Sequence, residues 1–281
     1  MNVLSLQSWV SYGHVGNAAA MFPLQRLGAE VWGVHTVQFS NHTGYADWTG
    51  NVFDGAAISA LVAGIARRGV LPACDAVLSG YLGAIDLGMA LLDAVRQVKR
   101  ANPRALYCCD PVIGDEGREY VRPGIPELLR TELLPVADIA TPNSFELSRL
   151  TGSPCATLAA AKQAVTHLQA LGPRTVLVTS LRTEATPPDA LDLLVGENNT
   201  FCLLRTPLLP VTVNGAGDML AALFLYHRLA TGSARAALER ASSSLFGVIR
   251  QTAEEGATEL AIIAAQEELI RPSRQFTAHP C

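Results

Sequence analysis

Short runs of apolar and β-branched residues alternate along the chain with longer segments in which apolar positions recur every three or four residues. The short runs predict buried strands, and the longer segments predict amphipathic helices. The predicted strands are residues 3–7, 30–39, 75–81, 105–112, 137–143, 175–180, 191–196 and 200–205. The predicted helices are residues 16–27, 57–69, 88–101, 145–152 and 160–172, together with nearly all of the C-terminal third.

This alternation of strands and helices predicts an α/β fold. Near-continuous apolar strands separated by helices indicate a mostly parallel central sheet with helices on both faces. The last two predicted strands lie close enough in sequence to form a hairpin. We find no internal repeat, low-complexity tract or linker, so we expect residues 1–281 to form a single domain. The loops near residues 40–50 and 114–122 are candidate lids.

The composition is that of a globular protein, with 281 residues of which 49% are hydrophobic and 16% charged. The net charge of -4 does not suggest a nucleic-acid partner, since such proteins usually carry a basic patch. No signal peptide and no apolar run long enough for a membrane span is visible. The six cysteines form no CxxC pair or metal-binding spacing, so we expect a reducing cytoplasmic location.

Lysine is rare, and its two positions exclude some chemistry. Only Lys99 and Lys162 occur, both in polar helical segments where we expect them to be solvated. A Walker A loop needs a GK[ST] sequence, which the chain lacks. A catalytic Schiff-base lysine is also not expected.

Small, polar or turn-forming residues follow each predicted strand. In open α/β sheets, ligands bind beyond the carboxyl ends of the strands, so this recurrence predicts a ligand cleft along one sheet edge. The residues in question are Ser8, His42, Thr43, Gly80, Tyr81, Asp110, Thr141, Asn143, Thr179, Ser180 and the segment 215–218. Each alone is also explained as an ordinary turn former.

The segment "NGAGD" (residues 214–218) stands where a strand-like run gives way to an apolar helix. Gly215 and Gly217 permit positive φ and close approach of the backbone. One interpretation is a tight turn with Asp218 favourably placed at a helix N-terminus. The other is an anion site built from bare N–H groups, with Asp218 facing an attacking hydroxyl. The GxGD pattern alone does not decide between them.

Two other strand ends carry carboxylates with a structural and a chemical interpretation each. Asp110 after "YCC" suits either a Mg²⁺ site or an Asx turn. Asn143 and Glu146 have the spacing of a capping box, and Glu146 also suits an outer-sphere Mg²⁺ ligand. Thr179 and Ser180 are placed either to bond phosphate oxygens or simply to form a turn.

Aromatic residues accompany these polar positions. Tyr45 and Trp48 in the loop after the second strand suit an apolar lid, and Tyr81 and Tyr120 suit the surroundings of a flat ring. Core packing and an ordinary surface loop are the alternatives. A lone histidine such as His42 is more often structural than functional.

Taken together, these segments resemble the pyridoxal kinases of the ribokinase-like superfamily. The resemblance is carried by "LSLQSWVSYGHVGNAAAMFPLQRLG", "QFSNHTGY", "DAVLSGYLG", "YCCDPVIGD", "ADIATPNSFEL" and "NGAGDMLAALF". Of these, "QFSNHTGY" is the most specific, whereas GAGD alone indicates only the superfamily. The resemblance implies ATP-dependent phosphorylation of the 5′-hydroxyl of pyridoxal, with Mg²⁺, a monovalent cation such as K⁺, and a homodimer.

The resemblance also implies roles for individual residues. Asp218 is the expected general base, and Gly215, Ala216 and Gly217 the anion hole. Ser8 is expected on the pyridine-nitrogen side of the substrate, with Thr43, Gly44 and Tyr81 lining the ring pocket. The expected ATP-binding residues, of which Asp110 and Glu146 also serve the metal, are Asp110, Tyr120, Asn143, Glu146, Thr179, Ser180, Arg205, Thr206, Pro207 and Leu208.

Asp218 beside an anion hole is expected to be ionised at neutral pH, so that it acts through its placement rather than a raised pKa. Three alternatives to the pyridoxal kinase hypothesis remain. One is a sister kinase for hydroxymethylpyrimidine, or for pyridoxine and pyridoxamine as well. Another is a non-catalytic vitamin B6 carrier. A dinucleotide-binding enzyme is disfavoured, because the glycine motif lies far from the first strand.

Overall fold

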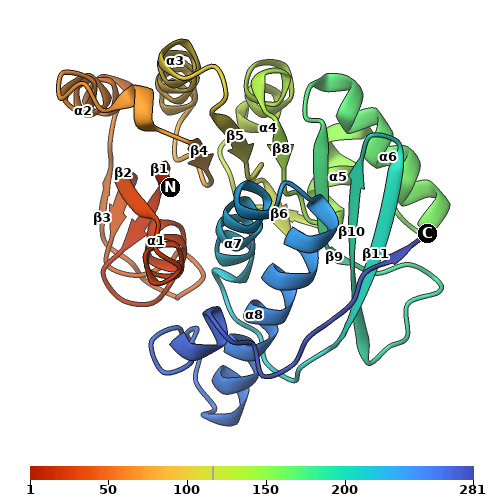
Figure 1. Cartoon of the computed structure of the whole chain (residues 1–281). Coiled ribbons are helices and arrows are strands. Elements are labelled where there is room, and N and C mark those ends of the chain that lie inside the picture. The colour runs from red at the N-terminus through yellow and green to blue at the C-terminus, as the bar shows by residue number, and fades with distance from the viewer. Residues whose placement is uncertain (116) are drawn as a thin grey trace.

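The computed structural model describes residues 1–115 and 117–281 of the chain. Within these residues, ten strands form one sheet in the order β12-β11-β10-β9-β8-β5-β4-β1-β2-β3 (Figure 1). These strands are β1 (Asn2–Val10), β2 (Glu30–Phe39), β3 (Gly50–Val52), β4 (Ala76–Ser79), β5 (Leu106–Cys109), β8 (Ile139–Ala140), β9 (Thr175–Leu181), β10 (Ala190–Glu197), β11 (Thr200–Pro207) and β12 (His279–Pro280). A separate small hairpin pairs β6 (Gly114–Asp115) with β7 (Arg118–Glu119).

The centre of the sheet is parallel, as predicted. Strands β2, β1, β4, β5, β8 and β9 run parallel to one another. At the two edges of the sheet, β3 and the strands β10, β11 and β12 each pair antiparallel with their neighbours. The chain moves from β1 to β2 on one side and then to β4 on the other, so β1 marks the point where the strand order reverses. A crevice is expected beyond the carboxyl ends of strands at such a point.

Helices cover both faces of the sheet (Figure 1). In that view α2 (Gly55–Ala66), α3 (Ile85–Ala101), α4 (Ile125–Leu128), α5 (Ser144–Thr151) and α6 (Leu158–Leu171) lie above the sheet. Helices α1 (Asn17–Arg26), α7 (Ala216–Thr231) and α8 (Ala234–Glu254) lie below it. The α/β class with two helical layers is therefore confirmed.

Each helical layer forms its own apolar core against the sheet. Successive residues of a strand point to opposite faces of the sheet. Leu4 therefore belongs to the core between the sheet and helices α2 and α3, and Val3 to the core between the sheet and helices α7 and α8. Both side chains are fully buried. Burying one such side chain contributes about 1.5–3 kcal/mol. The double burial explains why the central strands are apolar throughout rather than alternating.

Most predicted elements match the structure to within a few residues. The hairpin of β10 and β11 is confirmed, and its turn residues Asn198 and Asn199 have φ values of 51° and 59°. Asparagine tolerates this left-handed conformation better than most residues, which explains the "NN" at the turn. The short strands β3, β6, β7 and β12 and the helical turns over residues 125–136 have no clear periodicity and were not predicted.

The prediction that nearly all of the C-terminal third is helical is wrong. Helix α8 ends at Glu254, and the following residues contain only the 3₁₀ turn Gln266–Leu269 and β12. Gly256 has a φ of 62°, which ends the helix. The apolar residues that suggested a helix, including Leu260, Ile262 and Leu269, are buried against α1 and α8 by an irregular backbone.

Lys99 is held by neighbouring groups, which corrects the expectation that it is solvated. Its ammonium lies 2.7 Å from Asp138 Oδ2 and donates a hydrogen bond to the carbonyl of Val136 at 2.8 Å. Lys162 lies over the ring of Phe201, 5.6 Å from its centroid. Both lysines therefore have specific partners.

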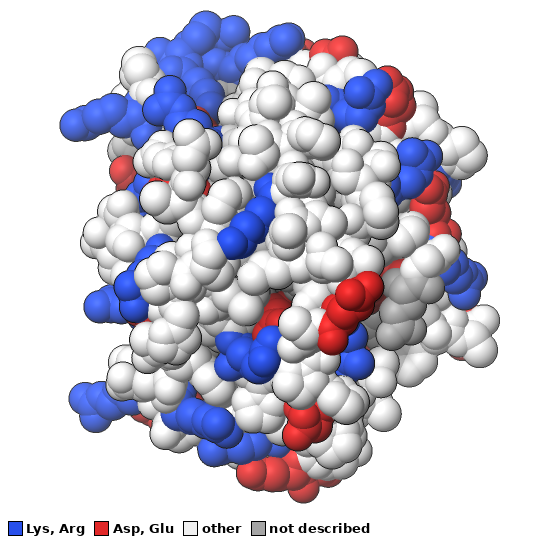
Figure 2. All heavy atoms as spheres, turned by 90° about the vertical axis from the view of Figure 1, so that its right-hand side faces the viewer, with Lys and Arg blue, Asp and Glu red and all other residues white. Residues whose placement is uncertain are grey.

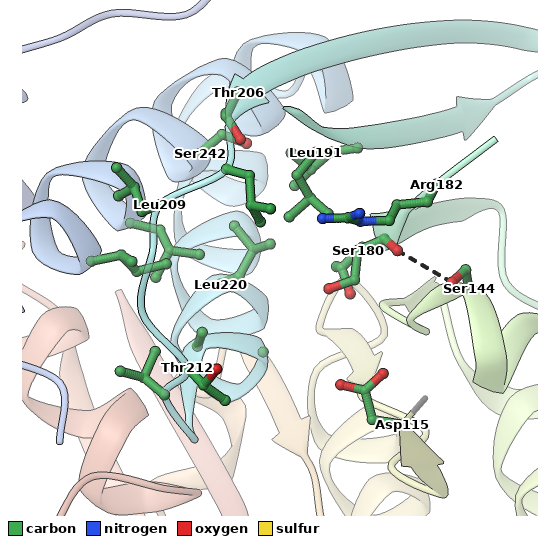
Figure 3. Close-up of a pocket in the computed structure, with 18 of the residues that line it drawn as sticks. Asp115, Ser144, Ser180, Arg182, Leu191, Thr206, Leu209, Thr212, Leu220 and Ser242 are labelled. Carbon is green, nitrogen blue, oxygen red and sulfur yellow. Dashed lines mark hydrogen bonds between the residues drawn. The ribbon is translucent and has the colours of Figure 1, made fainter. Parts of the chain in front are cut away.

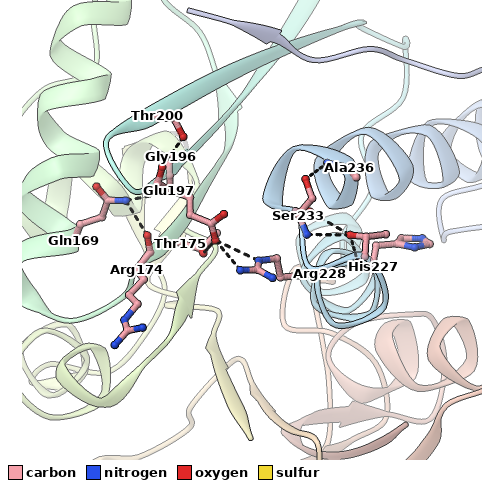
Figure 4. A network of polar contacts seen from close by, with 11 residues as sticks. Gln169, Arg174, Thr175, Gly196, Glu197, Thr200, His227, Arg228, Ser233 and Ala236 are labelled. Carbon is pink, nitrogen blue, oxygen red and sulfur yellow. Dashed lines mark hydrogen bonds and ion pairs between the residues drawn. The ribbon is translucent and has the colours of Figure 1, made fainter. Parts of the chain in front are cut away.

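A polar network ties the C-terminal end of α7 to the sheet (Figure 4). Glu197 at the end of β10 accepts hydrogen bonds from Thr175 at 2.6 Å and from Arg228 Nη2 at 2.9 Å. Gln169 of α6 adds bonds to the carbonyls of Arg174 and Gly196. Because Arg228 belongs to the last turn of α7, this network fixes the end of the helix opposite to its glycine turn.

The surface carries mixed charge on the side shown in Figure 2. Lysine and arginine side chains gather along the upper and left borders of this face, and acidic side chains are scattered between broad uncharged areas. In the described part of the chain, no helix combines the length and apolar character needed to cross a membrane.

Candidate active site

The glycine turn before α7 leaves its first N–H groups free of intrahelical partners. Gly215 has a φ of 84°, and a Cβ at this position would lie 1.8 Å from the carbonyl oxygen of His14. Only glycine satisfies both constraints. The first bond of the helix runs from Met219 N to Gly215 O, so the N–H groups of Ala216, Gly217 and Asp218 precede the hydrogen-bonded ladder. Such a turn binds anions.

Gly217 does not use the positive φ that glycine permits. It belongs to α7 and is absent from the glycines with left-handed backbone. A Cβ at Gly217 would meet no atom within 4 Å. Its missing side chain therefore leaves open space beside the turn, which suits the close approach of a ligand.

Asp218 lies in the first turn of α7 and faces the N-terminus of α1. Burial raises the pKa of its carboxyl from 3.8 to about 6, and the N–H of Gly16 partly offsets this rise. The carboxylate is still the main form at pH 7. The expectation that Asp218 is ionised at neutral pH therefore agrees with this pKa, whereas the expectation that it acts without a raised pKa is wrong, because burial raises it. A pKa near 6 suits a general base at neutral pH.

Asp110 follows β5 and is buried beneath the same edge of the sheet. Thr141 Oγ1 donates to Asp110 Oδ1 at 2.9 Å. Burial raises the pKa of Asp110 well above its ordinary value, and the negative charges of Glu146 and Asp218 raise it further. Three carboxylates from separate segments therefore converge here.

Glu146 forms the predicted capping box with Asn143 at the start of α5. Asn143 Oδ1 accepts from Glu146 N at 2.8 Å, and Glu146 Oε2 accepts from Asn143 N at 2.9 Å. The other oxygen, Oε1, accepts from Ile113 N at 2.8 Å. Burial raises the pKa of Glu146 to about 7. Since both oxygens are engaged by N–H groups, direct metal coordination is less suitable than an outer-sphere role.

Tyr120 lies near the carboxylates of Glu146, Asp218 and Asp110. About half of its side chain is exposed, yet burial of the hydroxyl end raises its pKa, and the charges of Glu146, Asp218 and Asp110 add to the rise. Residue 116 of the expected lid 114–122 lies outside the described residues. The rest of that segment contains the β6–β7 hairpin. Asn143 Nδ2, at the start of α5, donates a hydrogen bond to the carbonyl of Gly114 in this hairpin at 2.8 Å.

The cluster of the Asp110, Glu146 and Asp218 carboxylates is chemically suited to binding a cation. Its oxygens are the hard donors that Mg²⁺ prefers. Burial raises the pKa values of Asp110 and Glu146, and neighbouring negative charges add to the rise, so a bound cation would relieve the cost of ionising them. Across residues 1–115 and 117–281, no three His, Cys, Asp or Glu side chains are arranged to hold a metal ion by themselves. This is the usual situation for Mg²⁺ bound through one or two carboxylates, water and substrate phosphates.

A cavity of about 820 Å³ opens beside the glycine turn (Figure 3). It is large enough for a drug-sized ligand. Its lining includes the small or polar residues Ser144, Thr179, Ser180 and Gly217, and apolar residues of β10 and α8 such as Leu191, Leu245 and Phe246. Of the expected ATP-binding residues, the structure places in this lining Thr179, Ser180, Thr206, Pro207 and Leu208.

Arg205 is not part of this cavity lining. Its guanidinium lies 2.6 Å and 2.8 Å from the two carboxylate oxygens of Asp192, which is buried. Neighbouring side chains of a strand point in opposite directions, so Thr206 faces the cavity and Arg205 turns away from it. Arg205 therefore joins β11 to β10 within the hairpin through its ion pair with Asp192.

Much of the cavity lining was not among the candidates predicted from the sequence, and Arg182 and Ser242 are two polar examples. Arg182 reaches into the cavity from the chain after β9, and Ser242 lines it from α8 (Figure 3). Within the described residues, the buried hydroxyl of Ser242 has no hydrogen-bond partner. The helical pattern of α8 placed Ser242 on its buried face but gave no sign that this face borders a cavity.

The residues expected around the vitamin ring surround the carboxyl ends of β1 and β4. Ser8 is buried at an irregularity in the β1–β2 pairing, where the register shifts between Gln7 and Trp9. Such bulges commonly redirect a side chain. A Cβ on Gly16 would lie 2.3 Å from Ser8 Oγ, so a glycine is required beside it. Tyr81 follows β4 and packs with the small apolar cluster of Val10, Val37 and Phe39.

Thr43 and Gly44 lie exposed on the loop of residues 40–49, which we call the β2–β3 loop. Its ends are joined by a hydrogen bond from Ser40 N to Thr49 O at 2.7 Å. Trp48 packs on Phe39, with ring centroids 4.4 Å apart. The loop therefore has a defined shape at the same sheet edge as Ser8 and Tyr81.

Comparison with known proteins gives consistent matches. The phosphomethylpyrimidine kinase family matches residues 57–262. A pyridoxal kinase PdxY from Granulibacter bethesdensis is 62% identical, with 100% of both chains covered. The pyridoxal kinase PdxY of Rubrobacter xylanophilus is 51% identical over 98% of this chain and 96% of its own. The structure of Leishmania donovani pyridoxal kinase in complex with ADP and pyridoxine has a TM-score of 0.94 and 31% identity, covering 100% of this chain and 99% of that one.

Proposed function

The chain belongs to the pyridoxal kinase family, and on this premise we propose that it transfers the terminal phosphoryl group of ATP to the 5′-hydroxyl of pyridoxal. The product is pyridoxal 5′-phosphate. The observation that carries the proposal is the meeting of three features at one sheet edge. These are the α7 anion turn with Asp218, the 820 Å³ cavity, and the adjacent carboxyl ends of β1 and β4.

Asp218 is the proposed general base. Its carboxylate lies in the first turn of α7 beside the backbone of Gly16, and its pKa of about 6 leaves it mostly unprotonated at neutral pH. It accepts the proton of the 5′-hydroxyl as that oxygen attacks the terminal phosphorus, and the bond from this phosphorus to the bridging oxygen breaks to release ADP. The N–H groups of Ala216 and Gly217 stabilise the charge on the transferring phosphoryl group, as expected for a reaction that depends on positioning and charge neutralisation.

The nucleotide is proposed to occupy the large cavity. Thr179 and Ser180 contact phosphate oxygens, and the apolar residues of β10 and α8 surround the base. The residues that would hold Mg²⁺ are Asp110 directly and Glu146 through water. Mg²⁺ supplies neutralisation of phosphate charge when bound. A monovalent cation such as K⁺ and a lid role for the segment around Tyr120 belong to the same proposal.

Ser8, Thr43, Gly44 and Tyr81 are the proposed contacts of the vitamin ring. Tyr81 supplies an aromatic surface, and burial raises the pKa of its hydroxyl, which keeps it protonated as a donor. A second substrate is favoured by one observation, since the matching family is described as phosphomethylpyrimidine kinase. Hydroxymethylpyrimidine has a flat ring and a primary hydroxyl, as pyridoxal does.

We propose that residues 1–281 work as one domain, because β1 and β12, near opposite ends of the chain, belong to the same sheet. We further propose a homodimer and a cytoplasmic location. The cysteines are free thiols, four of them buried, which suits a reducing compartment. Exposed Leu61, Ile85 and Met89 on neighbouring helices α2 and α3 are the apolar surface that a second copy would cover.

The test is ATP consumption by the purified protein with Mg²⁺ and each of pyridoxal, pyridoxine, pyridoxamine and hydroxymethylpyrimidine alone. We expect turnover with pyridoxal and a product that absorbs as pyridoxal 5′-phosphate. Faster turnover of hydroxymethylpyrimidine would favour the second candidate. Pyridoxal binding without any turnover would replace the kinase by a carrier.

A further inference from the structure

Glu259 lies beyond α8, in the irregular C-terminal segment, yet its carboxylate reaches the candidate vitamin site. Its side chain is only 13% exposed. Oε1 accepts a hydrogen bond from Tyr45 Oη at 2.7 Å and lies 3.2 Å from His42 Nε2. Oε2 accepts from His14 N at 3.0 Å. One carboxylate therefore holds both the β2–β3 loop and the segment between β1 and α1.

The hydrogen bonds around His42 define its protonation. Gly44 N donates to His42 Nδ1 at 3.2 Å, so Nδ1 carries no proton. A carboxylate can only accept, so the nitrogen facing Glu259 must carry one. Glu259 thus selects the imidazole tautomer with the proton on Nε2. That tautomer is the one that can accept from Gly44 N–H and fix the turn between His42 and Tyr45.

The same group touches the catalytic turn. Asn214 Nδ2 lies 3.4 Å from His42 Nε2, and Asn214 directly precedes the glycine turn of α7. His42 also packs against Tyr45, with ring centroids 4.5 Å apart. The β2–β3 loop is therefore hydrogen-bonded to the C-terminal segment through His42 and Tyr45. His42 only lies beside the start of the anion turn, because Asn214 Nδ2 and the protonated Nε2 are both donors.

Gly13 provides a second, independent observation. It has a φ of 86°, and a Cβ there would lie 2.3 Å from Glu259 Oε2. No other residue would leave room for the carboxylate in this position. The chain before α1 is thus shaped to receive Glu259.

We infer that Glu259 is a positioning residue for the phosphorylation reaction. Through His42 and Tyr45 it fixes the loop that presents Thr43 and Gly44 to the vitamin, without contacting the reacting atoms itself. The inference rests on the proposed function, because it takes Thr43 and Gly44 as ring contacts. It assigns part of the vitamin site to the C-terminal segment.

The kinetic test is Glu259→Gln, which keeps the size of the side chain and removes its charge. We expect the KM for pyridoxal to rise about tenfold while the KM for ATP stays within about twofold. Tyr45→Phe should change the pyridoxal KM in the same direction by a smaller factor. The effects of the two changes should be non-additive in the double variant, because they act on one contact.

The matched control is Glu267→Gln. Glu267 belongs to the same segment and pairs with Arg26 at 2.6 Å, but its side chain is 73% exposed and remote from the β2–β3 loop. It should leave both KM values unchanged. An unchanged pyridoxal KM in Glu259→Gln, or equal rises in both KM values, would overturn the inference.

A spectroscopic test does not depend on activity. In protein labelled with ¹⁵N-histidine, His42 should show the tautomer protonated on Nε2, and Glu259→Gln or Tyr45→Phe should shift it toward a mixture. Finding the Nδ1-protonated form in the unchanged protein would contradict the inference directly. If the unchanged protein phosphorylates no vitamer, the proposed function fails, whereas the tautomer still reports whether Glu259 holds His42.

Discussion

At the scale of single residues, Asp218 and the two glycines beside it have different requirements. Gly215 is fixed by its left-handed backbone and by the carbonyl of His14. Gly217 is helical and borders open space. Asp218 is enclosed enough to have a raised pKa. The three neighbouring residues therefore differ in what they contribute. Gly215 meets a backbone constraint, Gly217 leaves open space beside the turn, and Asp218 is a titrating group.

Asp218→Asn should abolish most turnover. The amide keeps the shape of the side chain but accepts no proton, so kcat should fall by about 10²–10⁴. Binding of pyridoxal, measured by fluorescence or calorimetry, should change little. A variant with full kcat would remove Asp218 from the reaction.

The activity should have an acidic limb set by the same group. Because burial raises the pKa of Asp218 to about 6, the base is protonated and inactive below that pH and ionised above it. We expect kcat/KM for pyridoxal to rise with pH through about 6 and then level off. A profile that stays flat down to pH 5 would contradict the assignment.

The two glycines provide a matched pair of substitutions. Gly215→Ala should destabilise the protein by about 1–3 kcal/mol, because it places a Cβ on a left-handed residue against a carbonyl. Gly217→Ala should leave stability unchanged or raise it by up to about 1 kcal/mol through helix propensity. It should nevertheless raise the KM for ATP, since the methyl group enters open space beside the turn. Thermal unfolding and ATP kinetics separate the two effects, and equal losses of stability would contradict the distinction.

At the scale of elements, α7 is anchored at both ends. Its glycine turn lies under the carbonyl of His14, and Arg228 in its last turn is bound to Glu197 (Figure 4). Between them the helix is buried along most of its length. The anion turn therefore sits on a rigid element, as the placement of a phosphoryl group requires.

Glu197→Ala should weaken this anchor without reaching the chemistry. Arg228 and Thr175 both lose a partner that is mostly shielded from solvent, so we expect a loss of about 1–2 kcal/mol and a lower Tm. The kcat should stay within about twofold. The control is Glu127→Ala, which removes an exposed pair with Arg130 and should leave the Tm unchanged. A large fall in kcat at unchanged Tm would show that the network serves the reaction instead.

The sequence predicted the parts of the site that depend on local pattern. Gly215, Asp218 and the Asn143–Glu146 capping box are each defined by neighbours within a few residues, so a strand-to-helix transition revealed them. Glu259 could not be found in this way, because its partners are far away in the sequence and its own segment has no periodicity. Ser242 was also missed, since a helical pattern identifies a buried face but not a cavity beside it.

At the scale of the whole molecule, the central strands bring three carboxylates to one edge of the sheet. Asp110, Glu146 and Asp218 come from separate segments, and folding brings them together, with Asp110 and Glu146 buried and Asp218 half-buried. Each has a raised pKa, so the folded protein binds these protons more tightly than the unfolded chain does. The site therefore opposes folding whenever the groups are ionised and no cation is present.

This arrangement predicts how stability depends on pH. The pKa of Glu146 rises from 4.5 to about 7 and that of Asp218 from 3.8 to about 6 on folding. Between the unfolded and folded values the native state holds more protons, so the contribution of these groups to stability falls as pH rises. Without Mg²⁺, we expect removal of the pair in Asp218→Asn/Glu146→Gln to raise the Tm more at pH 8 than at pH 5.

Added Mg²⁺ should change how stability depends on the ionisation of these carboxylates. A cation that binds the ionised carboxylates stabilises the folded state by mass action, so Mg²⁺ should raise the Tm of the unchanged protein more at pH 8 than at pH 5. The double variant, measured alongside, should lose most of this response. An equal response in both proteins would place the cation elsewhere.

The placement of the two lysines has a consequence for the fate of the protein itself. Pyridoxal 5′-phosphate is an aldehyde, and aldehydes form imines with free amines. The ammonium of Lys99 is bound by Asp138 and Val136, and that of Lys162 rests on Phe201. Neither lies in the cavity beside α7. The enzyme can therefore release a reactive product with little risk of modifying its own chain.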